Sequence, residues 1–215
     1  MADFFHEIEE DLRRDQAVAL WNKYGNWVIG AALLLILAVA GHWGWTKYST
    51  HQRLQASADF LAAATNADAT QRDAALAAVA AEGGSYATLA RFRLAETALN
   101  AGDKAKARGI LGEVAADAST DPALAGLARI QAALLELEIG KPEAAADLVK
   151  DMIVEGHAYR LAALEVTGLA ALAGGDKAKA KTTFEELKKA AAADNVGGGA
   201  SFEHRADQLL DRLKG

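Results

Sequence analysis

The chain has 215 residues, a formal net charge of −6 and no cysteine. An acidic chain without a basic patch argues against a nucleic-acid partner, and a chain without thiols forms neither disulfides nor cysteine metal sites. The length leaves room for one membrane span and a single soluble domain of ordinary size.

Residues 1 to 24 are predicted to form an amphipathic leader helix on the cytoplasmic side of a membrane. Phe5, Ile8 and Leu12 recur at helical spacing, while acidic and arginine side chains occupy the other faces. Two interpretations of this leader remain open: it docks onto a membrane partner, or it lies on the lipid surface.

Residues 25 to 46 are predicted to cross a membrane as one helix. Between Lys23 and Lys47 lie 23 residues without Asp, Glu, Lys or Arg. At a rise of about 1.5 Å per residue, such a helix spans a hydrocarbon core of about 30 Å. Aromatic rings that favour the headgroup level flank both ends: Trp21, Tyr24, Trp27, Trp43, Trp45 and Tyr48. We interpret His42, which lies within a turn of the second aromatic cluster, as interfacial and not as part of a proton or metal path.

Two other interpretations of this stretch are disfavoured. A cleaved signal peptide needs a basic start and small residues at its cleavage site, whereas this chain opens acidic and places Trp43 and Trp45 after the apolar run. A buried core helix needs apolar neighbours on all sides, and the remaining alanine-rich chain supplies too few. We therefore expect a retained anchor.

The distribution of basic residues favours a cytoplasmic N-terminus by a small margin. Three basic residues precede the span, and two, Lys47 and Arg53, follow it closely. A long C-terminal domain can cross the membrane regardless of its charge, and a chain without cysteine suits an oxidising compartment. A cytoplasmic location of the C-terminal domain stays open as an alternative.

Beyond the span the chain is predicted to be all-α, with a connecting helix over residues 47 to 70 and a helical domain over residues 71 to 215. Helix-forming residues dominate, the breaks fall at Gly, Asp and Pro, and no stretch alternates with a period of two over strand length.

The two ends of this domain carry further signals. We expect Thr70 and Asp73 to form a capping box at the helix of residues 71 to 82. A C-terminal helix over residues 202 to 213 is expected to cap the domain, or else to swing on the glycine tether of residues 197 to 199.

Three turn glycines, Gly102, Gly140 and Gly175, carry the same pattern of residue sizes around them. They lie 38 and 35 residues apart, and a period near 34 residues is typical of stacked helix pairs. Small residues stand seven before and five after each glycine, and larger apolar residues nine after it: Ala95, Ala133 and Gly168; Ala107, Ala145 and Ala180; Leu111, Val149 and Phe184. Because antiparallel helices approach closely only where a small side chain faces the other helix, this pattern predicts helical hairpins.

These units resemble tetratricopeptide repeats, whose small helix-contact positions coincide with the small residues above. The aromatic residue usual four positions before the turn glycine is replaced by Ala98, Glu136 and Ala171, so the repeats are degenerate. The expected fold class is therefore all-α, with one N-terminal transmembrane helix followed by a tetratricopeptide-like solenoid of helical hairpins.

The whole layout, with the leader EIEEDLRRDQ, the aromatic-flanked span LWNKYGNWVIGAAL and the repeats, resembles a bacterial family of ancillary translocon subunits. The repeat domain of that family is shared with a cell division coordinator family, and the resemblance covers nearly the entire chain. It implies a single-pass inner-membrane protein with a cytoplasmic N-terminus and a periplasmic repeat domain. The partners it implies are translocon subunits, periplasmic chaperones and exported client proteins.

No catalytic, metal or cofactor site is expected. The five histidines are scattered, without a pair at helical spacing or a cysteine to complete a metal site. The glycine clusters lack the Lys-Ser/Thr that follows a phosphate loop, so no small-molecule substrate is indicated. No acid, base and nucleophile converge in the sequence.

A protein-binding surface is expected on the first helix of each pair, which lines the concave side of such a solenoid. At the repeat spacing this surface comprises Phe92, Glu96 and Asn100, then Ile130, Leu134 and Glu138, then Glu165 and Leu169. The predicted groove is apolar with an acidic rim and suits an amphipathic helix or an extended apolar segment of a client. The alternative for each apolar residue is ordinary packing between helices.

Two functions are compatible with these patterns. In the first, a membrane-anchored, non-enzymatic interaction module accompanies the translocon and shields or passes emerging clients. In the second, the chain is a structural accessory or assembly subunit of another inner-membrane complex, of respiration or of cell division.

Overall fold

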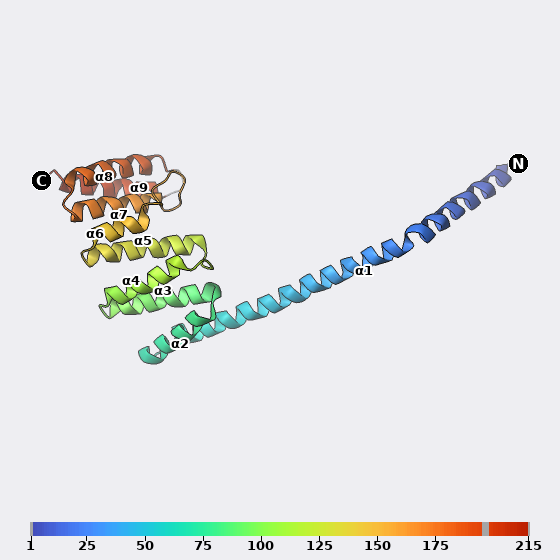
Figure 1. The fold of residues 1–215 in the computed structure, drawn as a ribbon, viewed down its shortest axis with the longest axis horizontal. Coiled ribbons are helices and arrows are strands. Elements are labelled where there is room, and N and C mark those ends of the chain that lie inside the picture. Colours follow the sequence, from blue (N-terminus) through green and yellow to red (C-terminus); the bar gives the residue numbers. More distant parts are fainter. Residues whose placement is uncertain (1, 195–197, 215) are drawn as a thin grey trace. The chain divides into compact units, whose positions relative to one another are not determined.

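The computed structural model describes residues 2–194 and 198–214, and its regular structure is helical throughout these ranges (Figure 1). Within them nine helices follow one another: α1 (Ala2–Ala64), α2 (Ala69–Glu82), α3 (Gly84–Asn100), α4 (Lys104–Ala116), α5 (Pro122–Glu138), α6 (Pro142–Val149), α7 (Arg160–Ala173), α8 (Lys177–Ala192) and α9 (Gly199–Arg212). The all-α prediction is confirmed. By internal packing the chain divides into two units, Met1–Gln55 and Ala56–Gly215, which are described separately.

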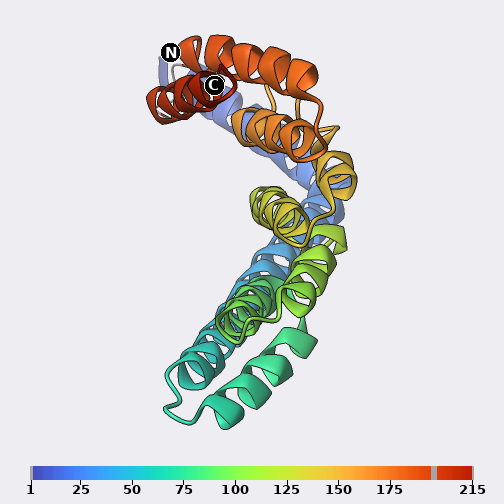
Figure 2. The same ribbon diagram turned by 90° about the vertical axis from the view of Figure 1, so that its left-hand side faces the viewer.

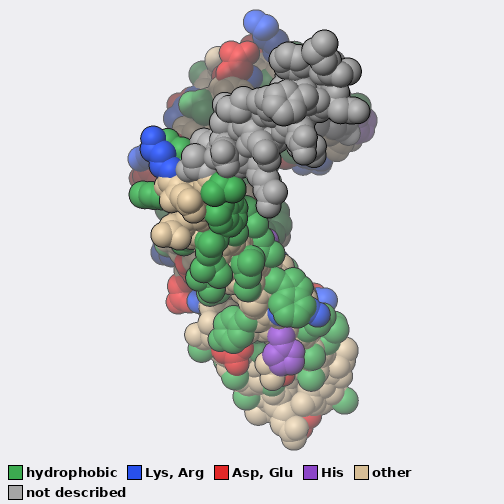
Figure 3. Space-filling view, turned by 90° about the vertical axis from the view of Figure 1, so that its right-hand side faces the viewer, with side chains coloured by type: hydrophobic (Ala, Val, Ile, Leu, Met, Phe, Trp, Pro, Cys, Tyr) green, Lys and Arg blue, Asp and Glu red, His purple; other side chains and the backbone are tan. Residues whose placement is uncertain are grey.

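The first unit contains the predicted membrane span. Among the described residues, α1 is the one helix long and apolar enough to cross a membrane, over Trp21–Ala64. The described apolar side chains of the predicted span are exposed: Leu34 is 71% exposed and Leu37 68%. Figure 3 shows hydrophobic side chains gathered along the described part of this helix. Because so much contiguous apolar surface is unfavourable in water, a bilayer is the solvent that suits it.

Aromatic and basic side chains meet at both ends of the span. Lys23 Nζ lies 5.3 Å from the centroid of the Tyr24 ring, and Lys47 Nζ lies 5.5 Å from that of Trp43. Such pairs suit the headgroup region, where the ring contacts lipid and the ammonium group contacts water. The predicted leader is helical as part of α1, and its predicted apolar face falls outside the described side chains.

The second unit is a stack of helical hairpins. Figure 2 shows the hairpins arranged in an arc, with α3, α5 and α7 along its inner side and α4, α6 and α8 along its outer side. The unit begins at Ala56, earlier than the boundary at residue 71 expected from the sequence. The reason is that Phe60 and Ala63, near the end of α1, pack against Leu76 and Val79 of α2. The last turns of α1 therefore serve as the first helix of the first hairpin.

The three turn glycines adopt the same conformation. The φ angles of Gly102, Gly140 and Gly175 are 79°, 80° and 85°, in the left-handed region that favours glycine. At the first turn, Asp103 N–H donates to the Ala98 carbonyl at 2.8 Å, and Gly102 N–H donates to the Leu99 carbonyl at 2.9 Å. The other two turns repeat this pair of hydrogen bonds. Each turn thus closes the preceding helix in the same way and reverses the chain.

The predicted pattern of small and large residues is confirmed as the core of the hairpins. All nine positions are buried: Ala95, Ala133, Gly168, Ala107, Ala145, Ala180, Leu111, Val149 and Phe184. The closest approach occurs in the last hairpin, where a Cβ on Gly168 would lie 2.3 Å from Cε1 of Phe184. The small residue therefore decides how near α7 and α8 come to each other.

The predicted capping box at the start of α2 is wrong. Asp68 caps this helix, because its carboxylate accepts the backbone N–H groups of Thr70 at 2.9 Å and of Gln71 at 3.0 Å. Asp73 instead accepts a hydrogen bond of 3.3 Å from the hydroxyl of Thr97 on α3. The Asp68 carboxylate, two residues before Thr70, satisfies two of the unpaired N–H groups at the helix start, so Thr70 is not the capping residue.

Two arginines that the sequence analysis did not single out join neighbouring helices. Arg91 and Arg129 each stand eleven residues before a turn glycine. Arg91 Nη2 donates to the Ala80 carbonyl at 3.2 Å, and Arg129 Nε donates to the Leu148 carbonyl at 3.0 Å. Both also pair with an aspartate after the second helix of their hairpin, so one guanidinium connects three segments.

Asp117, the carboxylate that pairs with Arg91, is held in its charged form. Ser119 donates to Oδ1 through its hydroxyl at 2.6 Å and its N–H at 2.9 Å, and Arg91 Nη1 donates to Oδ2 at 2.8 Å. These bonds, that of the Ser119 hydroxyl first, lower the pKa of Asp117 from its ordinary 3.8 to about 2. The turn between α4 and α5 is therefore stabilised by an ionised carboxylate.

The C-terminal helix α9 packs against α7 and α8. Arg205 donates to the two carboxylate oxygens of Glu165 on α7 at 2.7 and 3.0 Å, and Lys188 Nζ of α8 lies 2.6 Å from Asp207 Oδ1. Ala206 between these charged residues is fully buried. In this structure, apolar and charged contacts hold the C-terminal helix against the last hairpin.

We expect Gly168→Ala to lower the free energy of unfolding by about 1–3 kcal/mol, because the added methyl overpacks against Phe184. Gly109→Ala is the matched control: Gly109 lies inside α4, and a Cβ there meets nothing within 4 Å. The control should raise stability by about 0.5–1 kcal/mol through helix propensity. Urea denaturation of the full chain in detergent, followed by circular dichroism, measures both. Equal effects of the two changes would contradict the close-approach explanation.

The second prediction concerns acid stability. Because the pKa of Asp117 is lower in the folded state than its ordinary value, its contribution to stability is present above about pH 4 and is lost as the pH falls toward 2. Asp117→Asn should therefore make urea stability less dependent on pH in this window. The control Glu155→Gln, in the loop between α6 and α7, removes an acid that has no ion pair among the described residues. If Glu155→Gln changed the pH dependence of urea stability equally, the effect would come from the net charge and not from the Asp117 hydrogen bonds.

Candidate protein-binding groove

Two adjoining cavities form an elongated depression on the inner side of the arc, which we call the concave groove. The first has a volume of about 700 Å³ and is lined by Phe60, Leu89, Phe92, Arg93, Ala95, Glu96, Leu99, Leu111, Gln131, Leu134 and Leu135. The second, of about 520 Å³, is lined by Leu134, Leu137, Glu138, Leu169, Leu172 and Ala173. Leu134 on α5 lines both and so connects them.

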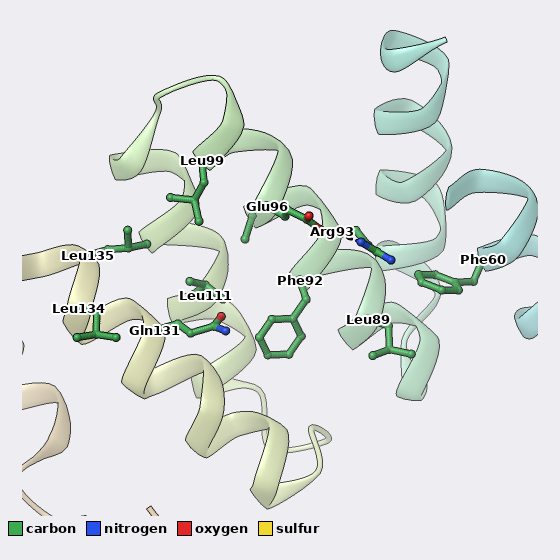
Figure 4. A pocket seen from close by; sticks show the side chains of 11 residues that line it. Phe60, Leu89, Phe92, Arg93, Glu96, Leu99, Leu111, Gln131, Leu134 and Leu135 are labelled. Carbon is green, nitrogen blue, oxygen red and sulfur yellow. Dashed lines mark hydrogen bonds and ion pairs between the residues drawn. The ribbon is translucent and has the colours of Figure 1, made fainter. Parts of the chain in front are cut away.

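Figure 4 shows how the first cavity is built. Phe92 and Leu99 project from α3, and Leu134 projects from α5 on the other side. Leu111 of α4 lies between these two helices and is almost completely buried, so it forms the floor. The groove therefore opens where α3 and α5 are separated, whereas α5 and α7 pack directly on each other.

The eight residues predicted to line the concave side stand ten, six or two residues before a turn glycine, and these three rows differ in their surroundings. The row six residues before each turn glycine, Glu96, Leu134 and Leu169, lines the groove throughout. In the row ten before, Phe92 lines the groove, but Ile130 and Glu165 do not.

Ile130 and Glu165 are covered by the next inner helix of the arc. Ile130 is 8% exposed and belongs to the core cluster that includes Ala163 and Val166 of α7. The Glu165 carboxylate accepts hydrogen bonds from Arg205 of α9. In this structure Ile130 therefore packs between helices, which was the alternative to lining the groove.

The row two residues before the glycines has a polar role. Glu138 lines the second cavity and pairs with Lys104 of α4, with 2.9 Å between Nζ and Oε2. Asn100 lies outside the groove, in a small polar pocket that also contains Arg72 and Thr97.

Further groove residues were missed by the sequence analysis although the repeat contained a signal for them. Leu99, Leu137 and Leu172 each stand three residues before a turn glycine, and all line the groove. Phe60 had no such signal, because the hairpin to which it belongs carries no repeat-type turn glycine. It is placed at the groove by its packing against α2 and α3.

The groove is apolar inside and electrically balanced at its rim. Leu89, Leu99 and Leu134 are three of the five exposed large hydrophobic residues described in the second unit. At the rim, Arg93 pairs with Glu96 at 2.8 Å, and Glu138 pairs with Lys104. Exposed apolar side chains clustered within a polar rim are typical of protein-binding surfaces.

The described residues offer no evident chemistry at this site. No group of three or more His, Asp or Glu side chains among them could hold a metal ion. Arg93 and Glu96 pair with each other, Glu138 pairs with Lys104 of α4, and no nucleophile lies among the lining residues of the groove. The arrangement is suited to binding another chain.

Comparisons with known proteins agree with this picture. The family model described as a tetratricopeptide repeat-like domain matches residues 19–210. The chain is also similar to a Haemophilus influenzae protein named ancillary SecYEG translocon subunit, with 27% identity over 191 residues, which cover 86% of this chain and 91% of that protein. No solved structure matches the chain.

A pair of substitutions one turn apart on α5 separates groove from core. Leu134 is 39% exposed, so Leu134→Glu should change the free energy of unfolding by less than about 1 kcal/mol. Ile130→Glu buries an unpaired carboxylate and should cost about 3 kcal/mol or more. Urea denaturation of the full chain measures both effects. A similar loss in the two variants would show that Leu134 belongs to the core.

Proposed function

Since the chain belongs to the tetratricopeptide repeat-like domain family, we propose that it is a membrane-anchored, non-enzymatic protein-interaction module ancillary to the protein-export translocon. The observation that carries the proposal is the concave groove, which exposes apolar side chains around Leu134 within a rim of paired charges. The name of the Haemophilus influenzae relative supports the translocon as the partner complex.

The proposed location is the bacterial inner membrane, with one span, a cytoplasmic N-terminus and a periplasmic repeat domain. The apolar part of α1 supports the anchor. Three basic residues before the span and two shortly after it support the orientation. In this location the groove meets exported proteins as they leave the translocon, together with periplasmic chaperones.

Local concentration explains how such a module acts. The anchor confines the groove to the membrane where clients emerge, so modest affinity is enough to hold a client briefly. A groove that covers apolar segments shields them from each other until a chaperone or the folding of the client takes over. No covalent step is needed for this role.

We expect a photoreactive amino acid at position 134 to capture translocon subunits, periplasmic chaperones and mixed exported proteins in living cells. Leu134 lines both cavities of the groove, and mass spectrometry identifies its adducts. Val154 is the control position, because it is 56% exposed but lines neither cavity. The same adducts at both positions would show contact without groove binding.

Two other outcomes would redirect the proposal. A single dominant adduct with one other membrane complex would make the chain a structural subunit of that complex. Adducts with cytoplasmic proteins would overturn the proposed orientation.

A further inference from the structure

The part of α1 that follows the predicted span is basic and contains no acidic residue. Between Asp15 and Asp59 the sequence has no Asp or Glu, whereas Lys47, His51 and Arg53 all follow the span closely. Charged side chains on a helix pair with partners three or four residues away, so none of these three basic residues has a carboxylate within reach on α1. Among the described residues, no ion pair from another helix involves them either. The positive charge at this end of the span is therefore not compensated by the described part of the protein.

Two of these basic side chains share one face of α1 with an aromatic ring. Trp43, Lys47 and His51 are spaced four residues apart, so they are neighbours along the helix surface. Lys47 Nζ lies 5.5 Å from the centroid of the Trp43 ring. Trp43 is 66% exposed, and Lys47 and His51 are exposed as well. We call these three residues the basic stripe. Arg53, six residues after Lys47, lies on another side of the helix.

The basic stripe lies at the depth of the lipid headgroups. Trp43 belongs to the second aromatic cluster, and such rings favour the boundary between hydrocarbon and headgroups. The headgroup layer on each side of a bilayer is about 5–8 Å thick, and four residues of helix rise about 6 Å. Side chains on a helix also lean toward its N-terminus, which is here toward the bilayer. Lys47 and His51 therefore reach the layer that contains the lipid phosphates.

The chemistry of the basic stripe suits a phosphodiester. The Lys47 ammonium group has three N–H donors, and the His51 ring donates from at least one nitrogen in either protonation state. The phosphodiester of a lipid carries one negative charge and accepts such hydrogen bonds. In a zwitterionic lipid the amine of the headgroup cancels this charge, whereas in an anionic lipid it remains. An uncompensated positive stripe therefore favours anionic lipids.

The other end of the span lacks this arrangement. Lys23 also lies over an aromatic ring, with Nζ 5.3 Å from the centroid of Tyr24. The residues four positions away from it are Ala19 and Trp27, so no second basic side chain adjoins it on the same face. The first 26 residues also contain six acidic and three basic residues. The two ends of the span thus present different charge to the two leaflets.

From these observations we infer that the basic stripe of Trp43, Lys47 and His51 binds the headgroup of an anionic phospholipid. Lys47 and His51 hold the phosphate, and the Trp43 ring packs against the glycerol and the first methylene groups of the acyl chains. The inference depends on the membrane anchor and goes beyond the function proposed for the concave groove.

The test is native mass spectrometry of the full chain in neutral detergent, with phosphatidylglycerol and phosphatidylcholine of identical acyl chains at equal concentration. The ratio of the two lipids in the first adduct is measured for the wild type and for the double variant Lys47→Gln/His51→Gln. Because both side chains are exposed, this variant should keep its helix content, which circular dichroism checks. Lys23→Gln is the matched control, since it removes a lysine over an aromatic ring at the other end. A further sample replaces the lipids with inorganic phosphate.

We expect the wild type and Lys23→Gln to bind phosphatidylglycerol at least about fivefold more than phosphatidylcholine, and the double variant to prefer it less than about twofold. No stable adduct with inorganic phosphate is expected, because a free ion makes no contact equivalent to that of the acyl chains. Equal binding of the two lipids by the wild type, or a preference that survives in the double variant, would overturn the inference. An equal loss in Lys23→Gln would show an effect of any interfacial lysine, and a phosphate adduct would point to a soluble anion instead; both results would contradict a lipid site at the basic stripe.

Discussion

The close approach of two helices around a left-handed glycine turn is the constraint on which the repeat domain depends. Each turn reverses the chain within a few residues, so the two helices of a hairpin must pack at short distance. Only a small side chain permits this at the crossing point, as the contact between Gly168 and Phe184 shows. The large residue nine positions after the glycine then fills the space beside the small ones, and hairpin follows hairpin along the arc.

The groove is a consequence of how these hairpins stack. Where α5 contacts α7, the facing residues are buried in the core. Where α7 contacts α9, they form an ion pair. Where α3 and α5 are separated, the same kind of face remains open above Leu111. α5 takes part in both arrangements, because Ile130 faces α7 while Leu134, one turn later, faces the groove. Binding surface and structural core are thus neighbours on one helix.

The protein exposes apolar side chains in two settings that differ in their surroundings. Along α1 the exposed residues form an uninterrupted apolar stretch, for which lipid is the suitable solvent. In the groove the exposed leucines lie inside a rim of paired charges, which is compatible with water when the groove is empty and with another chain when it is filled. Both settings are compatible with the membrane-anchored interaction module proposed above.

The sequence by itself determined the local features of this protein. The apolar run between Lys23 and Lys47, the turns at the three glycines, and the pattern of small and large residues around them follow from short-range rules, and the structure has them as predicted. These features depend on residues within one or two helical turns, which a single sequence displays directly.

Tertiary structure alone decided which of the predicted surface residues are available to a ligand. Helical periodicity places Phe92, Glu96 and their equivalents on one face, but it does not tell which neighbouring helix covers that face. Ile130 is covered by α7 and Glu165 by α9, while Phe92 stays open because α5 lies farther from α3. Phe60 reaches the groove through the packing of α1 on α2 and α3, a contact that no pattern within its own helix records. The physical reason is that burial depends on distances between helices, which the whole set of packed side chains decides.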